Sequence, residues 1–242
     1  MINNKNDLIR ELLKNMDQIS QQMRDIIYLN YFDKLGNENK YLLSMMADAF
    51  QTAKILCYAF QDVAVIQSGL LLRHFLEQVA ISYILVKHHD LLPKYVEHYK
   101  LRNELKNHSS KEKIKIISEK FSVPPRCSLA YLDYGWTGLS ANASDETNML
   151  KFAEFADILI WKKKYLDKMA HSSFVSTGLV GPDNDYPILT NFMEIAAKLF
   201  DYLCVAFHNL TYFDFVFGGE KLFDKFRDSY NKFYFSLYPN LA

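Results

Sequence analysis

The sequence predicts an all-α fold, and three observations support that prediction. Half of the 242 residues are apolar and 15% are aromatic, which is ample material for a core. The 8 glycines and 6 prolines are too few for the many turns of an all-β fold. Apolar residues recur at three- and four-residue spacing, the period of amphipathic helices. We expect one domain, residues 1–242, built as a bundle of about seven or eight helices.

Four helices are expected in the N-terminal half. The first lies within the first 30 residues and is marked by one apolar stripe: Leu8, Leu12, Leu13, Met16, Ile19 and Met23. A second is expected at about 41–60 and a third at about 61–88, which is the most apolar stretch and therefore the predicted central helix. Asp90 and Pro93 form a start signal for a fourth helix that extends to about residue 107.

The C-terminal half begins with a capping box, in which Ser109 and Glu112 start a helix over 111–121. Residues 126–144 are rich in Gly, Ser and Asn and are predicted to form a long ordered loop between the two halves. Further helices are expected at about 145–174 and 187–217. A short aromatic helix, 219–238, follows Gly218 and Gly219.

Charge and cysteine content exclude several classes of protein. Lys plus Arg equals Asp plus Glu, at 28 each, so no global field favours nucleic acid or an acidic membrane. Cys57, Cys127 and Cys204 are odd in number and widely spaced, which favours reduced thiols and a cytoplasmic location. Residues 64–86 are long enough to span a bilayer, but Arg73 and Glu77 lie at their centre, so we expect a buried helix and no membrane insertion.

Arg73 and Glu77 form the first candidate site. Their i,i+4 spacing puts both on one face of an otherwise apolar helix, and charged residues are rarely buried there without a partner. One interpretation is an internal ion pair that fixes helix register. The other is a site in which Arg73 binds a phosphate or carboxylate and Glu77 orients it. His74 points about 100 degrees away and is expected to be a core or interface residue.

His171 is the second chemically competent residue. A histidine can act as general acid or base because its pKa lies near neutrality, and Tyr165 and Lys168 lie on neighbouring turns. An exposed or capping histidine is the alternative. The run Lys162, Lys163 and Lys164 is either a local contact for nucleic acid or a solvated helix face.

Arg102 and His108 form a second candidate site, because the string RNELKNH matches the Arg-polar-His pattern of HEPN ribonucleases. Its position at the end of a helix equally suits a solvated C-terminal turn. No metal site and no cofactor are expected. His88, His89, Asp90 and His98 cluster in sequence but lack the spacing of zinc motifs, and no Gly-rich phosphate loop is present.

Four short motifs occur in a characteristic order: LLLRHFLEQ ending at Gln78, YGWTG over 134–138, a segment at 161–165, and KMAHSS over 168–173. This order, over roughly residues 41–210, resembles the bacterial domain-of-unknown-function family 5677. That family resembles HEPN toxins and antiviral ribonucleases in helical architecture. The resemblance implies that Arg73, Glu77, Trp136, Tyr165 and His171 converge on one polar pocket, with Lys164 and Lys168 near it.

Two functions follow as hypotheses. One is a HEPN-like, metal-independent RNA-processing enzyme of bacterial stress, toxin-antitoxin or phage-defence systems, with Arg73 stabilising phosphate charge and His171 handling the proton. The other is a non-catalytic helical interaction or oligomerisation module with a structural Arg-Glu pair.

The C-terminal stretch is rich in aromatic residues: Phe207, Tyr212, Phe213, Phe215, Phe217, Phe223, Phe226, Phe233, Tyr234 and Phe235. These rings either pack in the core of their own chain or form an exposed patch that a second copy covers. The second interpretation predicts a homodimer.

Overall fold

The computed structural model describes residues 5–27, 37–62, 64–167, 185–211 and 219–239. Within these ranges the regular secondary structure is entirely helical, which confirms the predicted all-α class. Ten α-helices lie in the described ranges, slightly more than expected, because the helix predicted at 145–174 is divided into two and the segment predicted as a loop, 126–144, contains a further helix.

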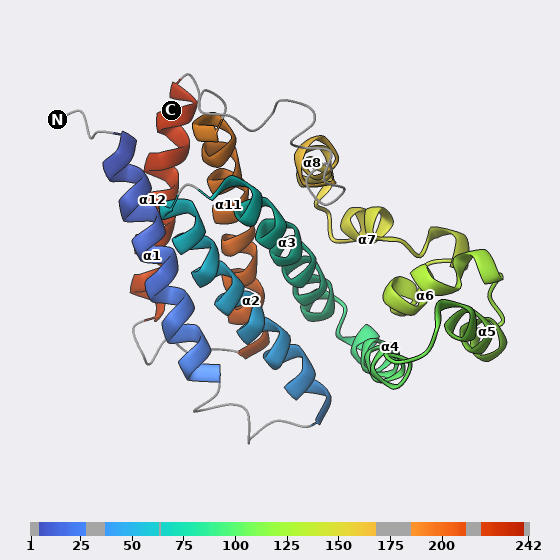
Figure 1. The fold of residues 1–242 in the computed structure, drawn as a ribbon. Coiled ribbons are helices and arrows are strands. Elements are labelled where there is room, and N and C mark those ends of the chain that lie inside the picture. Colours follow the sequence, from blue (N-terminus) through green and yellow to red (C-terminus); the bar gives the residue numbers. More distant parts are fainter. Residues whose placement is uncertain (1–4, 28–36, 63, 168–184, 212–218, 240–242) are drawn as a thin grey trace.

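Five long helices form the bundle: α1 (Lys5–Ile26), α2 (Asn37–Gln61), α3 (Val65–Lys87), α11 (Asp185–Thr211) and α12 (Gly219–Leu237). Figure 1 shows them side by side, with α3 on the side of the bundle that faces the smaller helices. Helix α3 packs against both α2 and α11, and α1 packs against α2 and α12. The predicted N-terminal stripe is confirmed, because Leu12, Met16 and Ile19 are fully buried.

Five shorter helices continue beyond α3: α4 (Leu92–Glu104), α5 (Ser110–Phe121), α6 (Ser128–Tyr134), α7 (Glu146–Phe152) and α8 (Ala156–Trp161). The predicted capping box is present at the start of α5, where Ser109 and Glu112 exchange side-chain and backbone hydrogen bonds. Helices α4 to α6 enclose a second small core: Leu101, Leu105, Ile117, Val123 and Leu132.

The segment 126–144, predicted as a loop, is ordered but contains helix α6 and three short 3₁₀ turns. Glycine is favoured at two positions of this segment, each for a different physical reason. A Cβ at Gly135 would lie 2.7 Å from the Tyr131 ring, and Gly138 has a φ of 76°, a conformation that side chains disfavour. Both features tighten the turn around Trp136, and the sequence pattern did not reveal that a helix precedes it.

The helix predicted at 145–174 is interrupted. Helix α7 ends at Phe152, and Glu154 adopts a left-handed φ of 64° before α8 begins. The turn is closed by the Phe155 amide, which donates to the Leu150 carbonyl, and by the ion pair between Glu154 and Lys87. A π-helical segment, Lys162–Leu166, follows α8. The expected continuation to 174 lies outside the described residues.

Two further expectations concern α3 and α12. Among the described helices, α3 is the one long and apolar enough to cross a bilayer, and 61% of its most apolar window is buried inside the chain, as in core helices. Phe226 and Phe233 of α12 are fully buried, so these two rings pack within their own chain. Phe235 and Tyr238 stay exposed, at 41% and 38%.

Candidate functional site

A network of four charged side chains surrounds Arg73 on α3. Its guanidinium lies 3.4 Å from Glu146 of α7 and 4.0 Å from Asp167. Lys162 reaches the same two carboxylates, with its Nζ 3.1 Å from Glu146 and 2.7 Å from Asp167. Two cations therefore face two anions, and each cation contacts both carboxylates. We call these four residues the charged network.

The local structure explains why the network forms. The Asp145 side chain accepts a hydrogen bond from the Asn148 amide, so it caps α7 and fixes Glu146 in its first turn. The π-helical turn brings residues five apart over each other, so Lys162 donates directly to Asp167. The Lys162 side chain is only 4% exposed, and a buried ammonium requires such partners.

Glu77 takes no part in this network. It accepts a hydrogen bond of 3.1 Å from the Tyr134 hydroxyl, whose pKa is raised by burial and by the negative charge of Glu77. The predicted pair between Arg73 and Glu77 is therefore replaced by separate partners: carboxylates of α7 and the π-helical turn for Arg73, and α6 for Glu77. The i,i+4 spacing put both residues on one side of α3 but could not reveal these long-range partners.

Trp136 belongs to the core and lines no open site. It is fully buried, its indole N–H donates to the Asp133 carbonyl at 2.9 Å, and its ring packs edge-on against Tyr95 at 5.2 Å. The structure thus does not bring Arg73, Glu77 and Trp136 around one pocket. Lys168 and His171 lie outside the described residues. Lys164 and Tyr165 lie in the π-helical segment, but their side chains are outside the described part.

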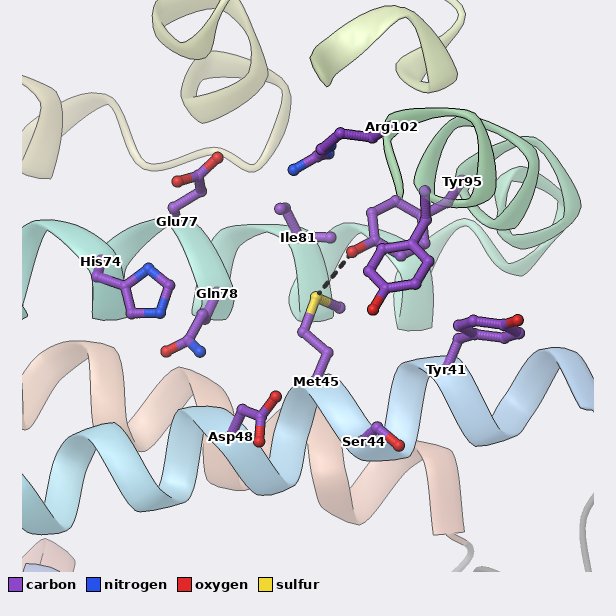
Figure 2. A pocket seen from close by; sticks show the side chains of 11 residues that line it. Tyr41, Ser44, Met45, Asp48, His74, Glu77, Gln78, Ile81, Tyr95 and Arg102 are labelled. Carbon is purple, nitrogen blue, oxygen red and sulfur yellow. Dashed lines mark hydrogen bonds between the residues drawn. The ribbon is translucent and has the colours of Figure 1, made fainter. Parts of the chain in front are cut away.

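A pocket of about 320 Å³ lies between α2, α3 and α4, on the neighbouring side of α3. Eleven side chains line it: Tyr41, Ser44, Met45, Asp48, His74, Glu77, Gln78, Ile81, Tyr95, Tyr99 and Arg102. Figure 2 shows these side chains projecting from the three helices into the space between them. The pocket combines residues of both predicted sites, because Glu77 and Arg102 share it.

The aromatic wall of the pocket is tightly packed. The rings of Tyr41 and Tyr99 meet edge-on at 5.4 Å, and the Tyr95 hydroxyl donates to the Met45 sulfur at 3.4 Å. Burial raises the pKa of Tyr95 to about 12, so this phenol stays neutral. The Lys100 ammonium lies 5.9 Å from the centre of the Tyr41 ring, which indicates that the ring face already attracts a cation.

The polar wall is incompletely hydrogen-bonded. Gln78 is 9% exposed, and its Oε1 is buried without a hydrogen-bond partner in the described part of the chain. His74 and Asp48 are exposed beside it, and the carboxyl of Asp48 is still partly desolvated, which raises its pKa against the opposing effect of His74. In the view of Figure 2, the Gln78 amide lies between the His74 ring and the Asp48 carboxylate.

Arg102 and His108 are not brought together. The Arg102 Nε lies 3.3 Å from Asp133, whereas His108 is exposed beyond the end of α4 and does not line the pocket. Sequence reasoning missed Asp48, His74 and Gln78 as pocket residues. The i,i+4 spacing of His74 and Gln78 was an available signal, since it marks a second polar face on α3.

Among the described residues, no group of three or more His, Cys, Asp or Glu side chains is placed to hold a metal ion. Comparisons of the chain with protein-family models, curated proteins and solved structures found no match. The arrangement therefore has to be interpreted from its own chemistry: a saturated charged network on one side of α3 and an open, partly unsatisfied pocket on the next.

Proposed function

We propose that this protein is a non-catalytic helical interaction module, in which the charged network around Arg73 holds α3, α7 and the π-helical turn together. The observation that carries the proposal is that both cations, Arg73 and Lys162, already contact both Glu146 and Asp167. A catalytic arginine needs a free guanidinium edge for the charge that develops on its substrate. Here an incoming phosphate would have to compete with two carboxylates.

The same four residues give the simplest test. Purified protein incubated with total RNA in EDTA should leave the RNA intact, because neither cation is free to bind phosphate. Arg73→Ala should lower the denaturation midpoint, with Arg10→Ala, an exposed arginine of α1, as the matched control. RNA cleavage that is lost in Arg73→Ala but kept in Arg10→Ala would overturn the proposal.

A second function is kept because of one specific observation: Glu77 and Arg102 line a single pocket together with His74. In this proposal the chain is a HEPN-like, metal-independent RNA-processing enzyme of stress, toxin-antitoxin or phage-defence systems. Arg102 would stabilise phosphate charge and His74 would exchange the proton, with His171 as the alternative acid or base. EDTA-resistant cleavage abolished by His74→Ala or His171→Ala would support it. Cleavage that persists in both variants would remove these assignments.

We also propose a homodimer and a cytoplasmic location. The exposed Phe235 and Tyr238 at the end of α12 are the rings available to a second copy, since Phe226 and Phe233 are buried internally. Light scattering should then report a dimer for the intact chain and a monomer for the double variant Phe235→Ser/Tyr238→Ser. A monomeric intact chain would contradict the homodimer proposal. The free thiols of Cys57, Cys127 and Cys204 support the cytoplasmic assignment.

A further inference from the structure

The pocket between α2, α3 and α4 contains an unusual buried acceptor. Gln78 is more than nine-tenths buried, and its Oε1 has no hydrogen-bond partner among the described residues. An unpaired acceptor of this kind is unfavourable, so buried polar atoms nearly always find a donor in the protein, in water or in a ligand. Gln78 lines the pocket, but its Oε1 is buried beneath the pocket surface, so a donor in the pocket reaches this oxygen when the terminal amide turns toward it.

The charges beside Gln78 define the donor further. Asp48 and Glu77 both line the pocket, and both carboxylates accept hydrogen bonds. Arg102 is the guanidinium in the lining; its charge is balanced by Asp133 at 3.3 Å, although its buried Nε has no hydrogen-bond partner among the described residues. With the charge of Arg102 paired to Asp133, the carboxylates of Asp48 and Glu77 leave the pocket with an excess of negative charge, which favours a cation with N–H donors over an anion.

The opposite wall suits the rest of such a ligand. Ile81 and Tyr95 are buried apolar surfaces, and Tyr99 presents a 37% exposed ring. Aromatic rings attract cations through their faces, and aliphatic carbons pack well on them. An ammonium group at Gln78 and Asp48 would thus place its aliphatic stem along the tyrosines (Figure 2).

We infer that this pocket binds an aliphatic ammonium ion, with its N–H groups donating to Gln78 Oε1 and the Asp48 carboxylate and its stem packing on Tyr95 and Tyr99. The ammonium comes either from a free amine or from a lysine side chain of a peptide, since both present the same group. This inference goes beyond the proposed function and is tested by binding alone, independently of the RNA assay.

The experiment is calorimetric titration of the full chain with n-pentylamine at pH 7, where an alkylamine is protonated. Saturable binding is expected. Pentyltrimethylammonium, which keeps the charge but has no N–H donor, and hexanoate, which is an anion, should bind at least about tenfold more weakly, because a hydrogen bond to a charged group is lost. Absence of saturable pentylamine binding, or equal binding of the trimethyl compound, would overturn the inference.

Variants localise the site. Gln78→Met keeps the side-chain volume and removes Oε1, and Asp48→Asn removes one charge from an exposed position that does not disturb the core. Each should weaken pentylamine binding by about tenfold or more. Gln67→Met, an exposed glutamine of α3 that does not line the pocket, is the matched control and should bind normally. Unchanged affinity in both pocket variants would contradict the assignment.

A last arm separates the two sources. Nα-acetyl-lysine methylamide carries the ammonium on a peptide-like backbone. If it competes with pentylamine at similar concentration, the pocket accepts a lysine side chain. If pentylamine alone binds, the ligand is a free amine. Either result supports the ammonium site. If both compounds bind but neither displaces the other, they do not share a site for the ammonium group, and the inference is contradicted.

Discussion

Helix α3 carries two polar regions that differ in how completely they are satisfied. On one side, Arg73 shares two carboxylates with Lys162, and Glu77 accepts from Tyr134. On the adjoining side, Gln78 is buried with an unpaired oxygen beside exposed His74 and Asp48. Saturated polar groups hold neighbouring elements in place, whereas a buried acceptor without a donor destabilises the fold until water or a ligand supplies one. The two regions should therefore respond in opposite ways to substitution.

The largest expected effect is at Lys162. Lys162→Met leaves Glu146 and Asp167 facing each other with only the partly exposed Arg73 to balance them. Removing one member of a buried ionic network typically costs about 3–5 kcal/mol, so the free energy of unfolding in urea should fall by roughly that amount. Lys163→Met, at the exposed neighbouring position, should change it by less than about 0.5 kcal/mol. Equal effects of the two variants would refute a structural role for the network.

How far the sequence predicted these regions depends on the range of the interactions. Arg73 and Glu77 were recognised as a polar site because i,i+4 spacing is a local property of a helix. Their partners, Glu146 and Tyr134, are separated from them by 73 and 57 positions and follow from how α6 and α7 fold back. Periodicity carries no information about such contacts.

The fold shows the same distinction between local signals, which the sequence reveals, and long-range contacts, which it does not. The five long helices were predicted near their observed positions, because apolar stripes, long apolar stretches and Gly or Pro boundaries are local signals. The break at Glu154 was missed, since neither glycine nor proline marks it and the left-handed φ falls on an ordinary glutamate. Helix α6 was missed because it is short and lies among loop-forming residues.

Arg73→Ala should have the second largest effect. Its side chain is 33% exposed, so solvent screens part of its attraction to Glu146 and Asp167. We expect a loss of roughly 1–2 kcal/mol, between the values for exposed and buried pairs. A double-mutant cycle with Glu146→Gln should show a coupling energy above about 0.5 kcal/mol. Additive effects would mean that the two residues do not interact, and the comparison between the two sides of α3 would fail.

His98 on α4 allows a further test, in which the stability of the fold is measured as a function of pH. It is 4% exposed and bonds through Nδ1 to the Leu132 carbonyl at 3.1 Å. Burial lowers its pKa, an effect that this hydrogen bond partly offsets. A lowered pKa in the folded state means that stability is present above the unfolded value of about 6.5 and is lost as pH falls toward the folded value.

In urea titrations at pH 7.5 and 5.5, the intact chain should therefore lose more stability on acidification than His98→Gln does. His108→Gln, at an exposed histidine, is the matched control and should behave as the intact chain. Parallel loss in the intact chain and His98→Gln would show that His98 does not couple to folding.

The smallest expected effect on stability is at Gln78, and it is the sharpest test of the comparison. If Oε1 has no partner in the free protein, then Gln78→Met removes a polar atom that burial penalises and adds an apolar group of similar volume. The free energy of unfolding should stay unchanged or rise by up to about 1 kcal/mol, while pentylamine binding is weakened. Destabilisation by more than about 1 kcal/mol would mean that Gln78 has a structural partner, and that both sides of α3 serve the fold.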